Sequence, residues 1–164
     1  MTQTIAELMA QFPHAGRVEW IGVRPARGAA MVEQKKVAIE MNGLAGDRRV
    51  LAKAKPGKRA VTFIQAEHIA TISALARLDG LKPHQLRRNI VVSGINVLAL
   101  RGQIFRVGSA LLKGTTVCAP CSKMEDQLGT GVYNAMRGHG GLCAEVIEPG
   151  SCAVGNELHF IKGG

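Results

Sequence analysis

The clearest strand signal in the chain is the stretch Lys36-Val37-Ala38-Ile39-Glu40-Met41. Apolar and polar side chains alternate along it, so Val37, Ile39 and Met41 fall on one face of an extended backbone. A strand of this kind covers a hydrophobic core with one face and meets water with the other. The stretch therefore predicts a β-strand that borders a hydrophobic interior.

Further short apolar runs follow at a spacing typical of β proteins. Strands are expected over residues 60–64, 89–92, 103–107, 144–147 and 157–161. One more strand is expected to run through residues 113–117 and to end before Pro120. Many short strands separated by glycine-rich turns favour a barrel, so the predicted fold class is mainly β with a few short helices. The residues expected to face a shared interior are Val37, Ile39, Ile90, Val92, Ile104, Val146 and Phe160.

One segment has helical rather than strand spacing. Over residues 66–78, Ile69 and Ile72 recur on one helical face, and Gly80 follows as a stop signal. We expect this helix to plug or flank the barrel. A shorter helix is expected over residues 132–137.

Length, charge and aromatic content narrow the classes of function. The chain has 164 residues with no repeat or linker, so a single domain over residues 1–164 is expected. A net charge of +9 indicates an anionic partner or a basic solvated surface. Trp20 and Tyr133 are the single Trp and Tyr, so platforms for stacking bases are scarce and nucleic acid is a less favoured partner. The N-terminus has no apolar run long enough for a signal peptide or membrane span, which predicts a cytoplasmic protein with reduced cysteines and no membrane partner.

The segment Cys118-Ala119-Pro120-Cys121 is the strongest candidate for a chemical site. Two thiols at this spacing can bind a soft metal or exchange a disulfide, or they can simply be buried small side chains. Zinc is disfavoured because eight residues separate Cys143 from Cys152, which is not the spacing of a zinc knuckle. Pro120 ends any strand before it, so we expect an accessible Cys121 on a loop and a shielded Cys118. Cys143 and Cys152 are expected in the core.

Two polar strings suggest anion recognition. The turn at residues 43–48 places Asp47 and Arg48 after two glycines, so its backbone amides and Arg48 are candidates for binding a phosphate. The alternative is a tight turn in which Asp47 caps backbone amides. Arg87 and Arg88 can grip an anion through forked hydrogen bonds, but neighbours on a strand point to opposite faces, so one of the two is expected to be structural. Asn89 is suited to bind a ligand edge or to satisfy loop backbone.

Three strings, in order, are Gly43-Leu44-Ala45-Gly46-Asp47-Arg48-Arg49, Leu86-Arg87-Arg88-Asn89-Ile90-Val91-Val92-Ser93-Gly94 and Cys118-Ala119-Pro120-Cys121. Together they resemble the MOSC domain, the module found at the C-terminus of molybdenum-cofactor sulfurases and as small stand-alone bacterial proteins. The resemblance extends from about Gly16 to Leu158. It implies a barrel-like β fold and a role in binding a molybdenum–pterin cofactor or a sulfur species.

The resemblance also implies roles for particular residues. In the amidoxime-reducing relatives the cysteine that matches Cys121 ligates molybdenum, and the string matching residues 87–90 lies at the cofactor site. A thiolate bonds well to soft centres such as molybdenum and sulfane sulfur, so one exposed cysteine is sufficient. The expected metal-binding and catalytic residue is thus Cys121. The expected cofactor-binding residues are Asp47, Arg48, Arg87, Arg88, Asn89 and Cys121.

The leading hypothesis is a MOSC protein in which Cys121 ligates molybdenum or carries sulfur as a persulfide. For a bound cofactor the resemblance implies reduction of N-hydroxylated compounds, with electrons from a separate flavin or iron–sulfur protein. The alternative is a basic, non-catalytic β-barrel that binds nucleic acid. A third possibility is a structural or interaction module in which Cys121 is unreactive.

Overall fold

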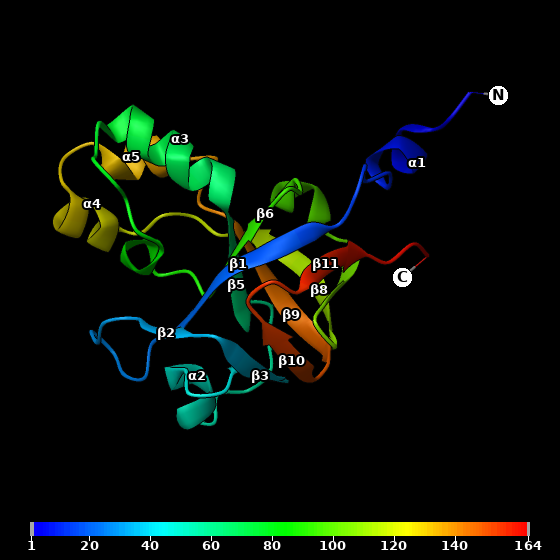
Figure 1. Cartoon of the computed structure of the whole chain (residues 1–164), viewed down its shortest axis with the longest axis horizontal. Coiled ribbons are helices and arrows are strands. Elements are labelled where there is room, and N and C mark those ends of the chain that lie inside the picture. Colours follow the sequence, from blue (N-terminus) through cyan, green and yellow to red (C-terminus); the bar gives the residue numbers. More distant parts are fainter. Residues whose placement is uncertain (1, 164) are drawn as a thin grey trace.

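A computed structural model describes residues 2–163, and its main feature is a barrel (Figure 1). Its strands are β1 (Gly16–Val23), β5 (Val61–Gln65), β6 (Ile90–Ser93), β7 (Ile104–Val107), β8 (Ala110–Val117), β9 (Leu142–Glu148) and β11 (Glu157–Phe160). Within the described range these seven strands follow the order β11-β7-β8-β9-β5-β6-β1, and pairing of β1 with β11 closes the ring. The predicted mainly β, barrel-type fold is confirmed.

A second, smaller sheet lies beside the barrel. It contains β10 (Gly150–Ala153), β3 (Lys36–Glu40) and β4 (Gly43–Leu44) in that order. A further strand, β2 (Val32–Gln34), pairs with the end of β1. The alternating stretch at residues 36–40 forms β3, and its side chains are buried and exposed in turn. Val37 and Ile39 face the core as expected, whereas Met41 lies beyond the strand and is exposed.

The main core fills the barrel and extends under β3. Val37, Ile39, Ile90, Val92 and Val146 all belong to it, as the sequence predicted. The rings of Phe63 and Phe105 meet edge to face at a centroid distance of 5.4 Å. Burying each such large apolar side chain stabilises the fold by roughly 1.5–3 kcal/mol.

Two of the predicted interior residues lie elsewhere. Along β7 the buried side chains are Phe105 and Val107, so the two-residue period places Ile104 on the other face. On β11 the residue in the core is Leu158. Phe160, two residues further along, stacks on Phe12 at a centroid distance of 4.9 Å instead. The prediction was wrong for Ile104 because of strand register and for Phe160 because it lies at the strand end.

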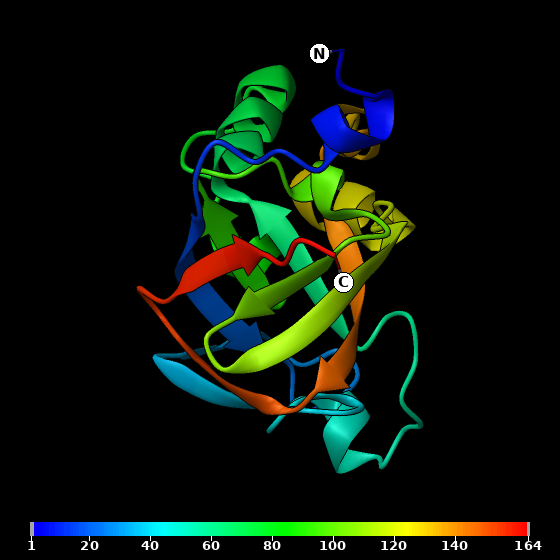
Figure 2. The ribbon, with the colours of Figure 1, turned by 90° about the vertical axis from the view of Figure 1, so that its right-hand side faces the viewer.

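Helices cover one side of the barrel (Figure 2). They are α3 (Ala66–Ala76), α4 (Ser122–Leu128) and α5 (Val132–Met136). A second apolar cluster joins them to β5 and β6, with Ile72, Met124 and Met136 fully buried. The helix predicted over residues 66–78 ends at Ala76 because Arg77 adopts a left-handed conformation, with φ of 52°. This helix flanks the barrel and does not plug it.

The remaining elements are short. They are α1 (Ile5–Met9), α2 (Arg48–Leu51), and the 3₁₀ helices η1 (Pro83–Leu86) and η2 (Val97–Leu100). Figure 1 shows α1 apart from the other helices and α2 beside the smaller sheet. Across residues 2–163, no helix has the length and apolar character needed to span a bilayer.

Candidate functional site

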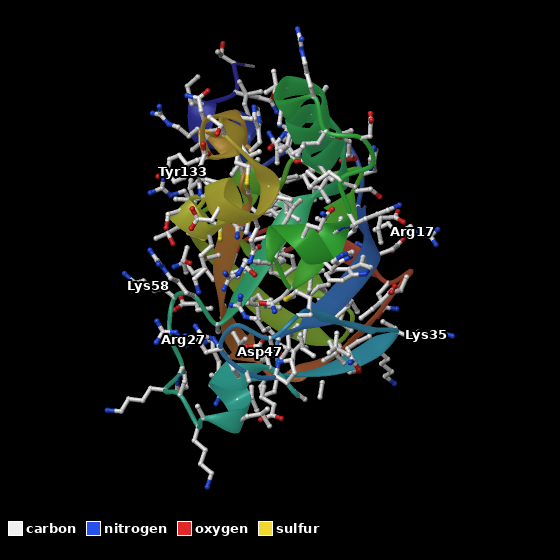
Figure 3. The ribbon with its side chains drawn as sticks, turned by 90° about the vertical axis from the view of Figure 1, so that its left-hand side faces the viewer. Arg17, Arg27, Lys35, Asp47, Lys58 and Tyr133 are labelled. Atoms are coloured by element: carbon white, nitrogen blue, oxygen red, sulfur yellow. The ribbon has the colours of Figure 1, made fainter. Side chains whose placement is uncertain are left out.

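All six residues proposed from the sequence line one cavity of about 480 Å³. These residues are Asp47, Arg48, Arg87, Arg88, Asn89 and Cys121. The cavity lies where the loop after β1, the turn before α2, the segment between η1 and β6, and the loop between β8 and α4 meet. Figure 3 faces the side of the molecule on which Asp47 lies. Segments distant in the sequence thus form a single candidate site.

Asp47 holds two of these segments together. Its side chain caps α2 by accepting a hydrogen bond of 3.2 Å from the Arg49 amide. Its other carboxylate oxygen accepts a bond of 3.0 Å from the amide of Arg24, directly after β1. Both contacts use backbone donors, as expected for a capping residue. Asp47 therefore fixes the cavity wall, which is the structural alternative considered from the sequence.

Asn89 has a similar scaffolding geometry. Its Oδ1 accepts hydrogen bonds of 3.1 Å from both the amide and the hydroxyl of Thr62. Its Nδ2 donates to the carbonyl oxygen of Gly22 at 3.2 Å and to Asp47 at 3.4 Å. The amide has partners on both sides, so in this structure its polar atoms bind protein rather than face an open site.

Arg88 is a buried clamp, with only 6% of its surface exposed. Its Nε donates to the Gly140 carbonyl at 2.7 Å, and its Nη1 donates to the Leu86 carbonyl at 3.2 Å. Its Nη2 donates to the carbonyls of Cys118 and Ala119, each at 3.2 Å. Carbonyl oxygens around a guanidinium satisfy a buried cation. Arg88 thus fixes the loop that leads to Cys121.

Arg87 differs from Arg88 in its backbone conformation. It follows η1 in a left-handed conformation with φ of 62°, before β6 begins at Ile90. Its side chain lines the cavity and also a neighbouring hollow of about 590 Å³, which shares Arg24 with the first. The two adjacent arginines are therefore separated by a turn of the backbone rather than by the alternation of a strand.

The cavity contains further arginines that sequence reasoning did not single out. Arg24 and Arg59 line it with Arg48 and Arg87, and the described residues provide none of these four guanidinium groups with an intramolecular hydrogen bond or ion pair. The Nε atom of Arg24 is buried without a partner. Burial lowers the pKa of Arg24, and the charges of Arg87 and Arg48 lower it further. Such a cluster is suited to an anion.

The thiols of the chain occupy distinct environments. Cys121 is exposed at the residue before α4, and Cys118 is half-buried. Cys143 was expected in the core; it is buried, but it also lines the cavity. Cys152 lies in the main core, where burial raises the pKa of its thiol to about 12. Cys121 is therefore the most accessible soft ligand at the site.

Two further observations concern metal-binding groups and the other large hollow of the molecule. In the part of the chain that the structure describes, no three His, Cys, Asp or Glu side chains converge as a metal-binding group. A larger hollow of about 980 Å³ lies between α1 and the C-terminal segment, but neither a thiol nor an arginine lines it. The smaller cavity has the reactive groups, so we assign the candidate site there.

Comparisons with known proteins agree with this architecture. The crystal structure of YuaD from Bacillus subtilis has a TM-score of 0.74 and 18% identity, with coverage of 90% of this chain and 97% of that one. YiiM from Escherichia coli has a TM-score of 0.66 and 21% identity, covering 89% of this chain and 70% of that one. YiiM from Geobacillus stearothermophilus gives 0.72 and 16%, with coverage of 90% and 75%. At these identities the likeness shows a shared fold.

The sequence itself carries a family signal. Comparison with curated protein sequences finds no match. A family model described as the MOSC domain matches residues 34–159, which include the turn at Asp47, the segment from Arg87 to Asn89, and Cys121. Because this match spans most of the chain, the protein belongs to the MOSC domain family.

Proposed function

We propose that this MOSC-domain protein binds a molybdenum–pterin cofactor in the cavity, with the Cys121 thiolate as the protein's ligand to molybdenum. The observation that carries the proposal is the meeting of one exposed thiol with an unpaired arginine cluster in a single cavity. A volume of about 480 Å³ is of the size that holds small ligands and cofactors.

The chemistry of the lining residues fits such a group. A phosphorylated pterin is anionic, and Arg24 has a buried Nε that lacks a partner within the described structure. Donating this N–H to a phosphate would satisfy it and would relieve the repulsion from Arg48 and Arg87. Molybdenum is a soft centre, for which a thiolate is a suitable ligand. The donor set therefore matches both ends of the cofactor.

The residues divide into those that bind and those that position. Cys121 would hold the metal, while Arg24, Arg48 and Arg87 would grip the anionic tail. Arg88, Asp47 and Asn89 fix the surrounding loops through hydrogen bonds within the protein. This division assigns the anion-binding fork to Arg87 and a positioning role to Arg88.

The bound cofactor would supply two-electron redox chemistry suited to the reduction of N-hydroxylated compounds. The hollow that shares Arg24 and Arg87 with the cavity provides room beside the site for a small substrate. A separate flavin or iron–sulfur protein would be the electron donor. Membership of the MOSC domain family supports this step.

Sulfur carriage is the second candidate, because Cys121 is exposed and lies at the start of α4, next to the cavity. A thiolate there can hold a sulfane sulfur as a persulfide. The two candidates use the same residue. They differ in whether the purified protein contains molybdenum or an additional sulfur.

The test is to isolate the protein from a host that makes the cofactor and to measure molybdenum, pterin fluorescence and cyanide-releasable sulfur. Cys121→Ser should lose the metal or the sulfur, whereas Cys152→Ala, which removes a thiol remote from the cavity, should keep it. Arg24→Gln should lose pterin, and Arg77→Gln, at an exposed arginine after α3, should retain it. Full loading of Cys121→Ser with molybdenum and sulfur would refute the proposal.

A further inference from the structure

Cys118, directly after β8, and Cys143 of β9 form a pair of thiols. Val117 of β8 lies opposite Leu142 of β9, and the Cys118 amide donates to the Gly141 carbonyl at 2.8 Å. By the two-residue alternation of strands, this register places both cysteine side chains on the same face. The two thiols lie close enough for each to shift the pKa of the other. Both cysteines are free, so the two thiols are neighbours that are not joined by a disulfide.

Backbone contacts hold the pair in place. The carbonyl of Cys118 accepts a bond of 3.2 Å from Arg88, and that of Cys143 accepts one of 3.0 Å from the Thr115 hydroxyl. A Cβ added at Gly140 would lie only 2.3 Å from the carbonyl oxygen of Cys118. The strand end and the glycine turn are thus packed closely, and the thiols cannot drift apart without breaking these contacts.

The two thiols are chemically unequal. The neighbouring Cys118 thiol lowers the pKa of Cys143 against the opposing effect of burial, with contributions from Thr116, Arg59 and Arg88. The Cys143 thiol, together with burial, raises the pKa of Cys118. This division matches a dithiol in which one sulfur attacks first and the other resolves.

The pair opens onto the candidate site. Both cysteines line the same cavity as Cys121, yet Cys143 is only 3% exposed. Small molecules that enter the cavity are therefore the compounds able to reach it. A protein partner or a bulky reagent meets Cys121 first, because Cys121 is exposed.

We propose that Cys118 and Cys143 form a second reactive centre, a dithiol that reduces small disulfides entering the cavity. The Cys143 thiolate attacks one sulfur of the disulfide, so a mixed disulfide forms and the first thiolate leaves and takes up a proton. Cys118 then gives up its proton and attacks the Cys143 sulfur, and the second thiolate leaves. The two cysteines lose two electrons and form a disulfide, while the small disulfide becomes two thiols.

A cofactor bound at Cys121 would occupy the same cavity, so the test uses the full chain with Cys121→Ser, the variant expected to lack the metal, as the background. The reduced protein is incubated without oxygen with 2-hydroxyethyl disulfide, and released thiol, intact mass and peptide links are measured. We expect two equivalents of thiol, loss of two hydrogen masses, and a Cys118–Cys143 link.

Two further variants separate the steps. Adding Cys118→Ser should stop the reaction at a mixed disulfide on Cys143 with one equivalent of thiol released. Adding Cys143→Ala should slow thiol release at least about tenfold, whereas adding Cys152→Ala should not change it. The wild-type chain needs no substitution and provides a check that does not depend on the variants folding. A Cys118–Cys121 link in the wild type, or no Cys118–Cys143 link in either protein, would overturn the proposal.

Discussion

The Nε atom of Arg88 donates a hydrogen bond of 2.7 Å to the carbonyl oxygen of Gly140, which ties the start of β6 to the turn before β9. The same guanidinium group binds the carbonyls of Cys118 and Ala119, so one buried side chain connects three segments around the site. The position of Cys121, two residues beyond Ala119, thus depends on an arginine that faces the protein rather than a ligand.

The first prediction concerns the stability supplied by this clamp. Arg88→Lys should lower the free energy of unfolding by about 2–4 kcal/mol, because an ammonium cannot reach carbonyls on all sides and buried donors are lost. Urea denaturation measures the change. Arg87→Lys is the matched control, with an expected effect within about 0.5 kcal/mol. Equal losses for the two variants would remove the distinction between them.

Arg24 should show effects of opposite sign on stability and on binding. Its Nε is buried without a partner, and neighbouring Arg48 and Arg87 repel its charge. Arg24→Met should therefore raise the free energy of unfolding of the ligand-free protein by about 0.5–1 kcal/mol. It should also weaken the binding of a pterin phosphate about tenfold or more.

Thermal unfolding with and without phosphate, followed by calorimetric titration, tests this combination. Phosphate should raise the melting temperature of the wild type and have little effect on Arg24→Met. Destabilisation of the ligand-free variant would mean that Arg24 has a structural role, as Arg88 does.

The elements of the fold were largely predictable from local patterns, while the membership of the site was predictable only in part. Alternation identified β3, and helical spacing identified α3, because these periods follow directly from which face is buried. Arg24 was missed because its role depends on Arg48 and Arg87, which are brought beside it by the tertiary fold. No local pattern marks such a meeting.

The two adjacent arginines show a second limit. Their separate roles follow from the left-handed conformation of Arg87, which is uncommon for a residue other than glycine and is not indicated by its neighbours in the sequence. Cys143 shows a third limit of sequence analysis. In sequence, a cysteine on an apolar strand looks the same whether its buried thiol faces the core or lines a cavity. Both distinctions required the packed structure.

A separate prediction concerns nucleic acid, the alternative partner that the net charge of +9 suggests. Arg24, Arg48, Arg59 and Arg87 are gathered at one cavity, and Arg88 and Arg49 beside them are already hydrogen-bonded to backbone carbonyls. We therefore expect weak binding of single-stranded and duplex DNA at physiological salt. Fluorescence anisotropy across a salt series measures it. Tight binding that weakens steeply with salt would favour the alternative of a basic nucleic-acid-binding barrel.

The substitutions Cys121→Ser and Cys118→Ser should separate binding from stability. Cys121 is exposed, so its serine variant should keep the melting temperature nearly unchanged while losing metal or sulfur. Cys118 is half-buried beside Cys143, so its serine variant should lose on the order of 1–3 kcal/mol of unfolding free energy. A bulky maleimide should label Cys121 faster than Cys118. Preferential labelling of Cys118 would contradict the assignment of the accessible thiol.

The last prediction concerns the pH dependence of Cys143. The pKa of Cys143 is lowered by the neighbouring Cys118 thiol, and Thr116, Arg59 and Arg88 add to this effect. The thiolate should therefore persist at pH values where an ordinary cysteine, with a pKa of about 8.5, is protonated. In the Cys121→Ser background, the rate of modification by methyl methanethiosulfonate should fall only as the pH drops through this lowered pKa. The same anionic form contributes stability that is complete above the unfolded pKa and is lost as the pH falls through the folded one. Cys118→Ala removes the neighbouring thiol and should move the inflection upward, while Cys152→Ala should leave it in place. An inflection near the ordinary cysteine value in the parent protein, or no upward movement in Cys118→Ala, would show that the pair is not coupled in this way.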